Sequence, residues 1–164
     1  MKKLLAIDQI FDMEQWTKLQ RSLAEVTNMA IITVDYKGIP VTEHSCCHEF
    51  CKKVRSDPTL GKFCQKCDSR GGLEAVRINE PYIYQCHFSI VDIAIPIMVN
   101  DKYLGAVMAG QVRLPIHKDD SFMEKIFTPA NPRIIDEAKE NLKELYNEIP
   151  FLSYERMQMI AMML

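Results

Sequence analysis

The sequence lacks a long hydrophobic run. None of its 164 residues falls in a stretch that approaches the roughly 20 apolar residues of a membrane-spanning helix. The apolar start of the chain ends at Asp8, far short of the hydrophobic segment of a secretory signal peptide. These absences favour a cytoplasmic protein, or the cytoplasmic part of a larger one, with no membrane partner.

Positive charge is neither abundant nor clustered. The chain has 20 Lys and Arg residues against 22 Asp and Glu residues, and its formal net charge is -2 at pH 7. Nucleic-acid-binding domains usually gather Lys and Arg on one face or along one helix. We therefore expect that this segment does not itself bind DNA.

Signatures of catalysis are also missing. The sequence has no nucleophile elbow, no phosphate-binding glycine loop and no pair of histidines at metal-ligand spacing on a helix. Its length suits one domain, residues 1–164, with a core that needs no disulfide or metal. We expect a binding domain and not an enzyme.

The chain is distinctive in its cysteines. Four of the six lie in one stretch: Cys51, Cys64, Cys67 and Cys86. The pattern over 64–77 predicts a helix on which Cys64 and Cys67 share one side. The same stripe continues through small or short residues, which lets the helix lie close to a neighbouring element. These residues are Asp68, Gly71 and Ala75.

Three interpretations of these thiols stay open. Because the cytosol disfavours disulfides, the four cysteines could hold zinc or an iron–sulfur cluster, or act as a redox switch. They could also be buried as small hydrophobic side chains. Cys46 or Cys47 could take the place of Cys51 in a thiolate site.

The hydrophobic pattern predicts helices at both ends of the chain. Asp12 and Gln15 have the form of a capping box and open an amphipathic helix that ends at Asn28. Near the other end, Asn131 caps a predicted helix that begins at Pro132, keeps its register through Leu145 and is ended by Pro150. Ser153 caps a last helix, which we expect to continue beyond Leu164.

That last helix carries one apolar stripe, formed by Met157, Ile160, Ala161 and Leu164. Such a stripe is buried either on the core sheet of its own chain or on the same helix of a second subunit. The second arrangement predicts a homodimer that Ile160→Asp weakens.

Several strands are expected between these helices. A β-hairpin is predicted over 29–42, with Pro40 assigning its second strand, 39–42, to a sheet edge. The other predicted strands are 82–86, 91–99 and 103–111. The last of these is nearly bare of large side chains, which is typical of a bulge, of a close ligand or of a helix packed on the sheet.

The predicted order defines an α+β fold. Helices are inserted between strands two and three of an antiparallel sheet, and further helices flank the sheet at both ends. This is the general architecture of PAS and GAF sensor domains.

A combination of short motifs runs through the same elements. It consists of Phe50-Cys51, Gly61-x-x-Cys64-x-x-Cys67-Asp68, Tyr84-x-Cys86-His87, Pro96-Ile97, Gly105 and Gly110-Gln111. Together these motifs resemble the PocR sensory domain, over residues 11–164. The resemblance implies a PAS-like input domain that binds a small hydrocarbon derivative such as 1,2-propanediol. It also implies a covalently linked transcription-regulatory or signalling output domain in a longer protein.

A pocket for a short diol needs a few hydrogen-bonding groups in an otherwise apolar cavity. The polar candidates nearest the sparse strand are Tyr84, His87, Asp92 and Gln111. Structural roles remain open for three of them: a core histidine, a turn cap at Asp92 and a strand-end partner at Gln111. The other histidines, His44, His48 and His117, lie in polar loop contexts and are expected at the surface.

Overall fold

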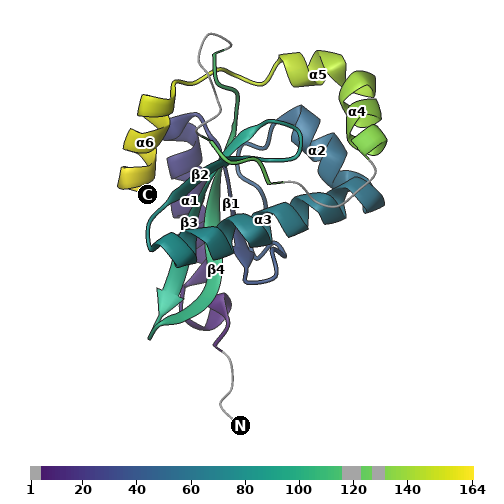
Figure 1. Cartoon of the computed structure of the whole chain (residues 1–164). Coiled ribbons are helices and arrows are strands. Elements are labelled where there is room, and N and C mark those ends of the chain that lie inside the picture. Colours follow the sequence, from purple (N-terminus) through teal and green to yellow (C-terminus); the bar gives the residue numbers. More distant parts are fainter. Residues whose placement is uncertain (1–4, 116–122, 127–131) are drawn as a thin grey trace.

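The domain is built on an antiparallel sheet (Figure 1). The computed structural model describes residues 5–115, 123–126 and 132–164, and within them the sheet has four strands in the order β1-β4-β3-β2. The strands are β1 (Ala30–Asp35), β2 (Tyr82–Gln85), β3 (Val91–Val99) and β4 (Lys102–Val112). The two long strands, β3 and β4, therefore form the centre of the sheet.

Helices cover both faces of this sheet. Figure 1 shows α3 crossing in front of the strands, with α6 at the left and α2, α4 and α5 at the upper right. The bounds are η1 (Ile7–Gln9), α1 (Met13–Thr27), α2 (Glu49–Ser56), α3 (Pro58–Ile78), α4 (Pro132–Asn141), α5 (Lys143–Asn147) and α6 (Tyr154–Met163). No helix among the described residues is long and apolar enough to cross a membrane.

Alternating side chains of the strands divide the core into two layers. On β3, Ala94 packs into the layer beneath α2 and α3, which we call the α3-side core. Its neighbour Ile93 packs into the opposite layer with Ala24 of α1 and Met157 of α6, which we call the α6-side core. Successive residues of a strand point to opposite faces, so a shift of β3 acts on both layers at once.

The small-residue stripe of α3 lies directly on the sheet, as the sequence predicts. A Cβ atom added at Gly71 would lie 2.6 Å from the ring of Tyr84, and one at Gly72 would overlap the Tyr103 hydroxyl. The thiols of Cys64 and Cys67 are buried on the same side of the helix. The absence of large side chains thus sets the distance between α3 and the strands.

The predicted second strand of the hairpin, 39–42, is wrong. Pro40 makes an isolated bridge to Val34, and the backbone hydrogen bonds beside it form no ladder: Asp35 donates to Ile39, and Val41 and Thr42 both donate to Thr33. Proline has no N–H for a ladder, and the Thr42 hydroxyl accepts from the Thr33 N–H at 3.0 Å in its place. Since 39–42 is not a strand, α2 and α3 lie along the chain between the first two strands of the sheet, β1 and β2. The α+β class itself is confirmed.

Helix ends agree with the sequence at most positions. Asp12 caps α1, Asn28 ends it in a left-handed conformation, and Ser153 caps α6. The helix predicted over 132–145 is interrupted at Leu142, where φ is -112° and ψ is 25°, and continues as α5. The predicted cap Asn131 lies outside the described residues.

The apolar stripe of α6 packs on the sheet of its own chain. Met157 and Ala161 are buried in the α6-side core, and Ile160 is 9% exposed there. The methionines on the outer side of the helix are exposed, with Met162 at 87%. Ile160→Asp therefore acts first on the fold, and the homodimer stays a prediction.

We predict that Ile160→Asp lowers the free energy of unfolding by about 3 kcal/mol or more, because it places a carboxyl group in an apolar layer of the core. Met162→Asp on the exposed side of α6 serves as the matched control and is expected to change stability by no more than about 0.5 kcal/mol. Urea denaturation followed by circular dichroism measures both. Equal small effects would contradict the packing of α6 on the sheet.

Candidate ligand-binding site

A small cavity lies in the α3-side core, between helices α2 and α3 and the sheet. Its volume is about 30 Å³, which is about the share of one water molecule in liquid water. Seven of the eight site residues expected from the sequence line it. They are Cys51, Cys64, Cys67, Cys86, His87, Asp92 and Gln111. The structure thus brings the polar and the thiol candidates together in one place.

Tyr84 is the expected site residue that does not line this cavity. It is fully buried in β2, where its ring packs against Gly71 of α3. Within the described residues its hydroxyl has no hydrogen-bond partner. Burial raises the pKa of Tyr84 well above its ordinary value. Tyr84 therefore packs between the sheet and α3 and does not line the cavity.

Cys86 and His87 both line the cavity because β2 ends at Gln85. The Cys86 N–H donates to the Ile90 carbonyl at 2.8 Å, and Ser89 has a φ of 61°, so the chain turns tightly here. Neighbouring residues of a strand point to opposite faces, but this turn directs both side chains to the same side.

His87 is a buried, neutral histidine. It is 4% exposed, and within the described part of the chain neither ring nitrogen has a hydrogen-bond partner. Burial lowers the pKa of His87 to about 4, and the positive charge of Arg55 acts in the same direction. At neutral pH the ring thus offers one donor and one acceptor to a molecule in the cavity.

A buried ion pair forms another part of the wall. Arg55 of α2 donates to the Asp68 carboxylate of α3 at 3.0 Å. Burial acts against the charge of Arg55, but the Asp68 carboxylate raises the pKa of Arg55 further above its ordinary value. Burial raises the pKa of Asp68, and the guanidinium opposes that rise. The pair places a guanidinium and the carboxylate that neutralises it beside the cavity.

Asp92 is the second buried acid of the site. Burial, together with the charge of Asp68, raises the pKa of Asp92 to about 7. One of its oxygens accepts from the backbone N–H of Gln111 at 3.3 Å. A Cβ added at Gly110 would overlap the same oxygen, so the bare strand lets this carboxyl lie against the backbone of β4.

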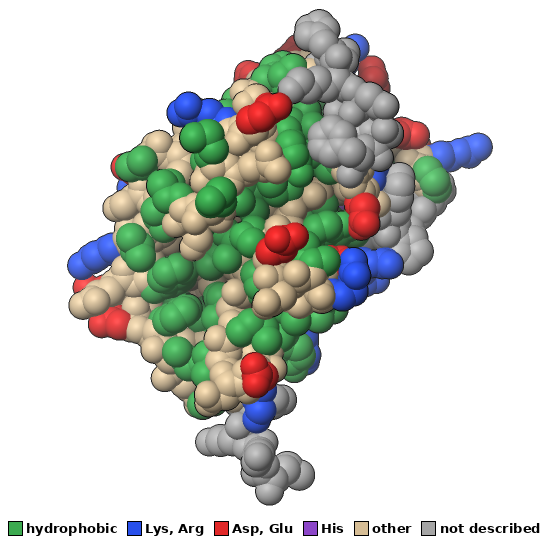
Figure 2. All heavy atoms as spheres, turned by 60° about the vertical axis from the view of Figure 1, so that its left-hand side comes forward, with side chains coloured by type: hydrophobic (Ala, Val, Ile, Leu, Met, Phe, Trp, Pro, Cys, Tyr) green, Lys and Arg blue, Asp and Glu red, His purple; other side chains and the backbone are tan. Residues whose placement is uncertain are grey.

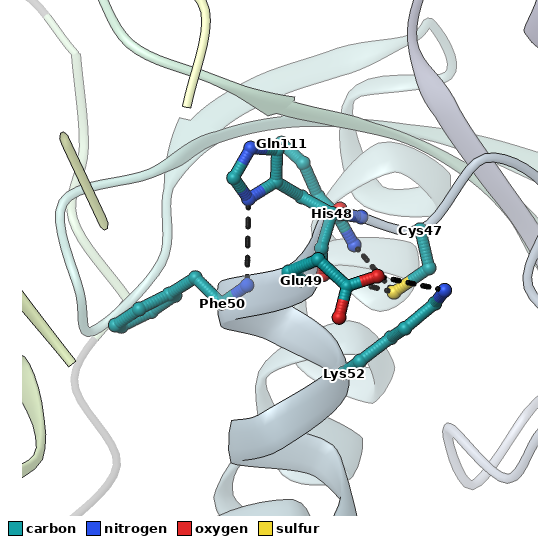
Figure 3. Close-up of polar contacts among 6 residues, drawn as sticks. All are labelled: Cys47, His48, Glu49, Phe50, Lys52 and Gln111. Carbon is teal, nitrogen blue, oxygen red and sulfur yellow. Dashed lines mark hydrogen bonds and ion pairs between the residues drawn. The ribbon is translucent and has the colours of Figure 1, made fainter. Parts of the chain in front are cut away.

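Gln111 is the extra residue of a β-bulge. Val91 pairs with Val112 and Asp92 with Gly110, which leaves Gln111 unpaired at a φ of 63°. Its side chain accepts from the backbone N–H of His48 at 2.5 Å and donates to the Cys47 thiol at 3.5 Å (Figure 3). The bulge thereby fastens the segment before α2 to the sheet.

The histidines expected at the surface take structural positions. His48 caps α2 by accepting from the Phe50 N–H at 3.4 Å (Figure 3). His44 is half-buried beside Gln111, and burial lowers its pKa to about 3, so the expectation of a surface residue is wrong there. His117 lies outside the described residues.

All six cysteines are free thiols. Burial raises the pKa of Cys64 to about 12 and raises the pKa values of Cys51, Cys67 and Cys86 as well. Among the described residues no group of three or more His, Cys, Asp or Glu is placed to hold a metal ion. Zinc or iron would require these thiols to lose protons and move together.

The sequence did not lead us to predict Arg55 as a site residue, or Asp68 as its partner in an ion pair. In the sequence Asp68 stood out as a short residue in the small stripe of α3 and as the end of the motif around Cys64 and Cys67, but not as a charged wall residue. A carboxylate on a buried helix face needs a cation, and this requirement was the available signal. Its partner lies on a different helix, 13 positions earlier.

The cavity lies between helices and one face of the antiparallel sheet, and a few polar groups converge on it, as they do in sites that bind small molecules. Residues 9–164 match the family described as the sensory domain found in PocR. This chain belongs to that family, and the resemblance seen in its motifs is confirmed. The family assignment makes the chain a sensory domain.

A curated relative agrees with this assignment. The chain is 30% identical over 142 residues to the regulatory protein PocR of Salmonella typhimurium strain LT2. The match covers 85% of this chain and 44% of that protein. The chain therefore spans less than half the length of this relative.

The raised pKa of Asp92 predicts a pH effect on stability. Between its ordinary pKa of 3.8 and about 7 the folded state holds a proton that the unfolded state releases, so this group lowers stability as pH rises. His87, with its pKa lowered from 6.5 to about 4, acts in the opposite sense. We expect the free energy of unfolding of Asp92→Asn, relative to wild type, to rise by roughly 2 to 4 kcal/mol across that window.

Urea unfolding at a series of pH values measures this difference, which removes the histidine contribution common to both proteins. Asp101→Asn, at an exposed position in the turn between β3 and β4, is the control and is expected to follow wild type. Parallel curves for wild type and Asp92→Asn would show that Asp92 is charged in the folded state at low pH.

Proposed function

We propose that the cavity binds a small, uncharged molecule with hydroxyl groups, such as 1,2-propanediol. Its occupancy would control a covalently linked transcription-regulatory or signalling domain. The observation that carries this proposal is the convergence of His87, Asp92 and the Arg55–Asp68 pair on one cavity of about 30 Å³ in a sensory domain. A cavity of this size is far smaller than the usual pocket for a small molecule, so the proposal requires the walls to move apart when a diol binds.

The charges of the wall favour a neutral ligand. Asp68 is already paired with Arg55, and Asp92 lies in the same wall with no second guanidinium lining the cavity. An organic acid would bring a third carboxyl group into this space, which costs free energy. A hydroxyl group can donate to Asp92 and also exchange hydrogen bonds with the neutral ring of His87.

The two-layered core supports a route for the signal. Asp92 faces the cavity, while its neighbour Ile93 packs with Met157 of α6 in the α6-side core. A ligand that moves β3 would therefore change the packing of the terminal helices. The proposal places the output on these helices, by binding alone and with no catalysed reaction.

We further propose a homodimer in the cytoplasm. Hydrophobic side chains are spread over the face of the molecule that carries α6 (Figure 2), and Met159, Met162 and Met163 are exposed on that helix. These methionines are the candidate contact in place of Ile160. The six free thiols support a reducing compartment.

Isothermal titration calorimetry with 1,2-propanediol and glycerol tests the ligand. We expect binding by the wild type, and an affinity about tenfold weaker in His87→Ala because one buried hydrogen bond is lost. Asp101→Asn, remote from the cavity, is expected to bind like wild type. Ligand at about 100 times its Kd raises stability by about 2.7 kcal/mol, which thermal unfolding detects. No response to a panel of short alcohols would reject a diol sensor.

A second candidate function is a metal or redox sensor. The observation in its favour is that Cys51, Cys64, Cys67 and Cys86 all line the same cavity. Elemental analysis and an absorption spectrum of anaerobically purified protein would then show stoichiometric zinc, or iron with visible colour. The variant Cys64→Ser is expected to lose the metal, whereas Cys46→Ser, at an exposed position, keeps it. A folded protein without metal would reject this version.

A further inference from the structure

Two hollows are lined in part by residues of α2. The first is the cavity of about 30 Å³. The second is an open groove of about 470 Å³ between the segment 40–47 and helices α2 and α3. Among the described residues, Arg55 alone lines both hollows. The side chain of Arg55 thus forms part of the wall of both spaces.

The ion pair fixes Arg55 in the wall. Asp68 holds its guanidinium at 3.0 Å, and the Asp68 side chain is only 3% exposed. The Arg55 side chain is 23% exposed, so one side of it reaches solvent in the groove. Swinging Arg55 outward would leave the buried Asp68 carboxylate without its cation, and this cost keeps the wall closed.

The remainder of the partition is held by hydrogen bonds. Gln111 lines the cavity, and its side chain contacts His44 at 3.2 Å and Cys47 at 3.5 Å, both of which line the groove. The segment 40–47 is also tied to α1, because the Gln20 amide donates to the Glu43 carbonyl at 3.0 Å. Arg55, a long side chain with several rotatable bonds, is the part of the partition that can move without breaking the sheet.

We infer that the groove is the vestibule of the cavity and that Arg55 is the side chain that closes the passage between them. This inference rests on the proposed function, since a ligand must reach His87 and Asp92 from solvent. In the closed state the guanidinium is bound to Asp68. In the open state it points into the groove and is hydrated, and a small neutral molecule passes.

The cavity thiols report on this passage without any ligand. Methyl methanethiosulfonate transfers its methylthio group to a deprotonated thiol, which forms a methyl disulfide on the cysteine and releases methanesulfinate. Mass spectrometry of peptides gives the labelling rate of each cysteine at alkaline pH. Cys64 reports on the cavity, and the exposed Cys46 is the internal standard for reagent and pH.

In wild type we expect Cys64 to react far more slowly than Cys46. In Arg55→Ala the rate at Cys64 is expected to rise about tenfold, while the rate at Cys46 does not change. Loss of the closing side chain admits reagent and water to the thiol, and this outweighs the loss of the Arg55 charge, which lowers the pKa of Cys64 in the wild type. If Arg55→Ala does not fold, Asp68→Asn provides the same comparison, since it weakens the pair and leaves the guanidinium in place. An unchanged rate at Cys64 in the folded variant would overturn the inference.

Unfolding is separated from opening by a second reporter. Ala109→Cys places a thiol in the α6-side core, where the native alanine is 1% exposed. In the background of Arg55→Ala this introduced thiol is expected to stay slow, and equal acceleration of its labelling and of labelling at Cys64 would overturn the inference. Calorimetry with 1,2-propanediol tests the proposed function separately: a failure there with fast Cys64 labelling in Arg55→Ala rejects the ligand and keeps the closure.

Discussion

The close packing of α3 on the sheet is the constraint on which the rest of the structure depends. Where the stripe consists of Gly71 and Gly72, no Cβ atom fits between the helix and the tyrosines of the sheet. One or two turns earlier the stripe changes to Cys64, Cys67 and Asp68, and here the helix stands over the turn that follows β2. The cavity forms where the glycines give way to these three residues. The glycines hold α3 close to the sheet, and the short side chains that precede them leave space between the helix and the turn.

The sheet contributes a second fixed point, the bulge at Gln111. Without it, the residue after Gly110 would continue the ladder, and its side chain would follow the alternation of β4. With it, the backbone N–H of Gln111 turns to Asp92 and the side chain turns to the segment before α2. Gln111, in its left-handed conformation, therefore fixes both the carboxyl group of Asp92 and the segment that leads into α2.

The predictability of these elements follows from the range of the interactions that form them. Strand β3 and the caps Asp12 and Ser153 depend on neighbours within a few positions, and the sequence predicts them at the right residues. The strand at 39–42 fails because Thr42 bonds to Thr33 and Gln20 through its hydroxyl, a contact that no local pattern encodes. Arg55 and Asp68 pair between two helices, so the sequence indicates the acid's need of a cation but not which cation meets it.

Under the proposed function, the same buried groups that shape the cavity would make the domain responsive to a ligand. His87 and Tyr84 keep polar atoms buried without partners among the described residues, which costs free energy in the folded state. A molecule whose hydroxyl groups meet His87 and Asp92 would recover part of that cost at the cavity, so its binding is favoured by the unmet hydrogen bonds it completes. On β3, Asp92 faces the cavity and Ile93 faces α6. The free energy of ligand binding at Asp92 could therefore shift β3 and with it the packing of α6. A sensory domain can in this way couple a ligand of a few atoms to an element on the opposite face of its sheet.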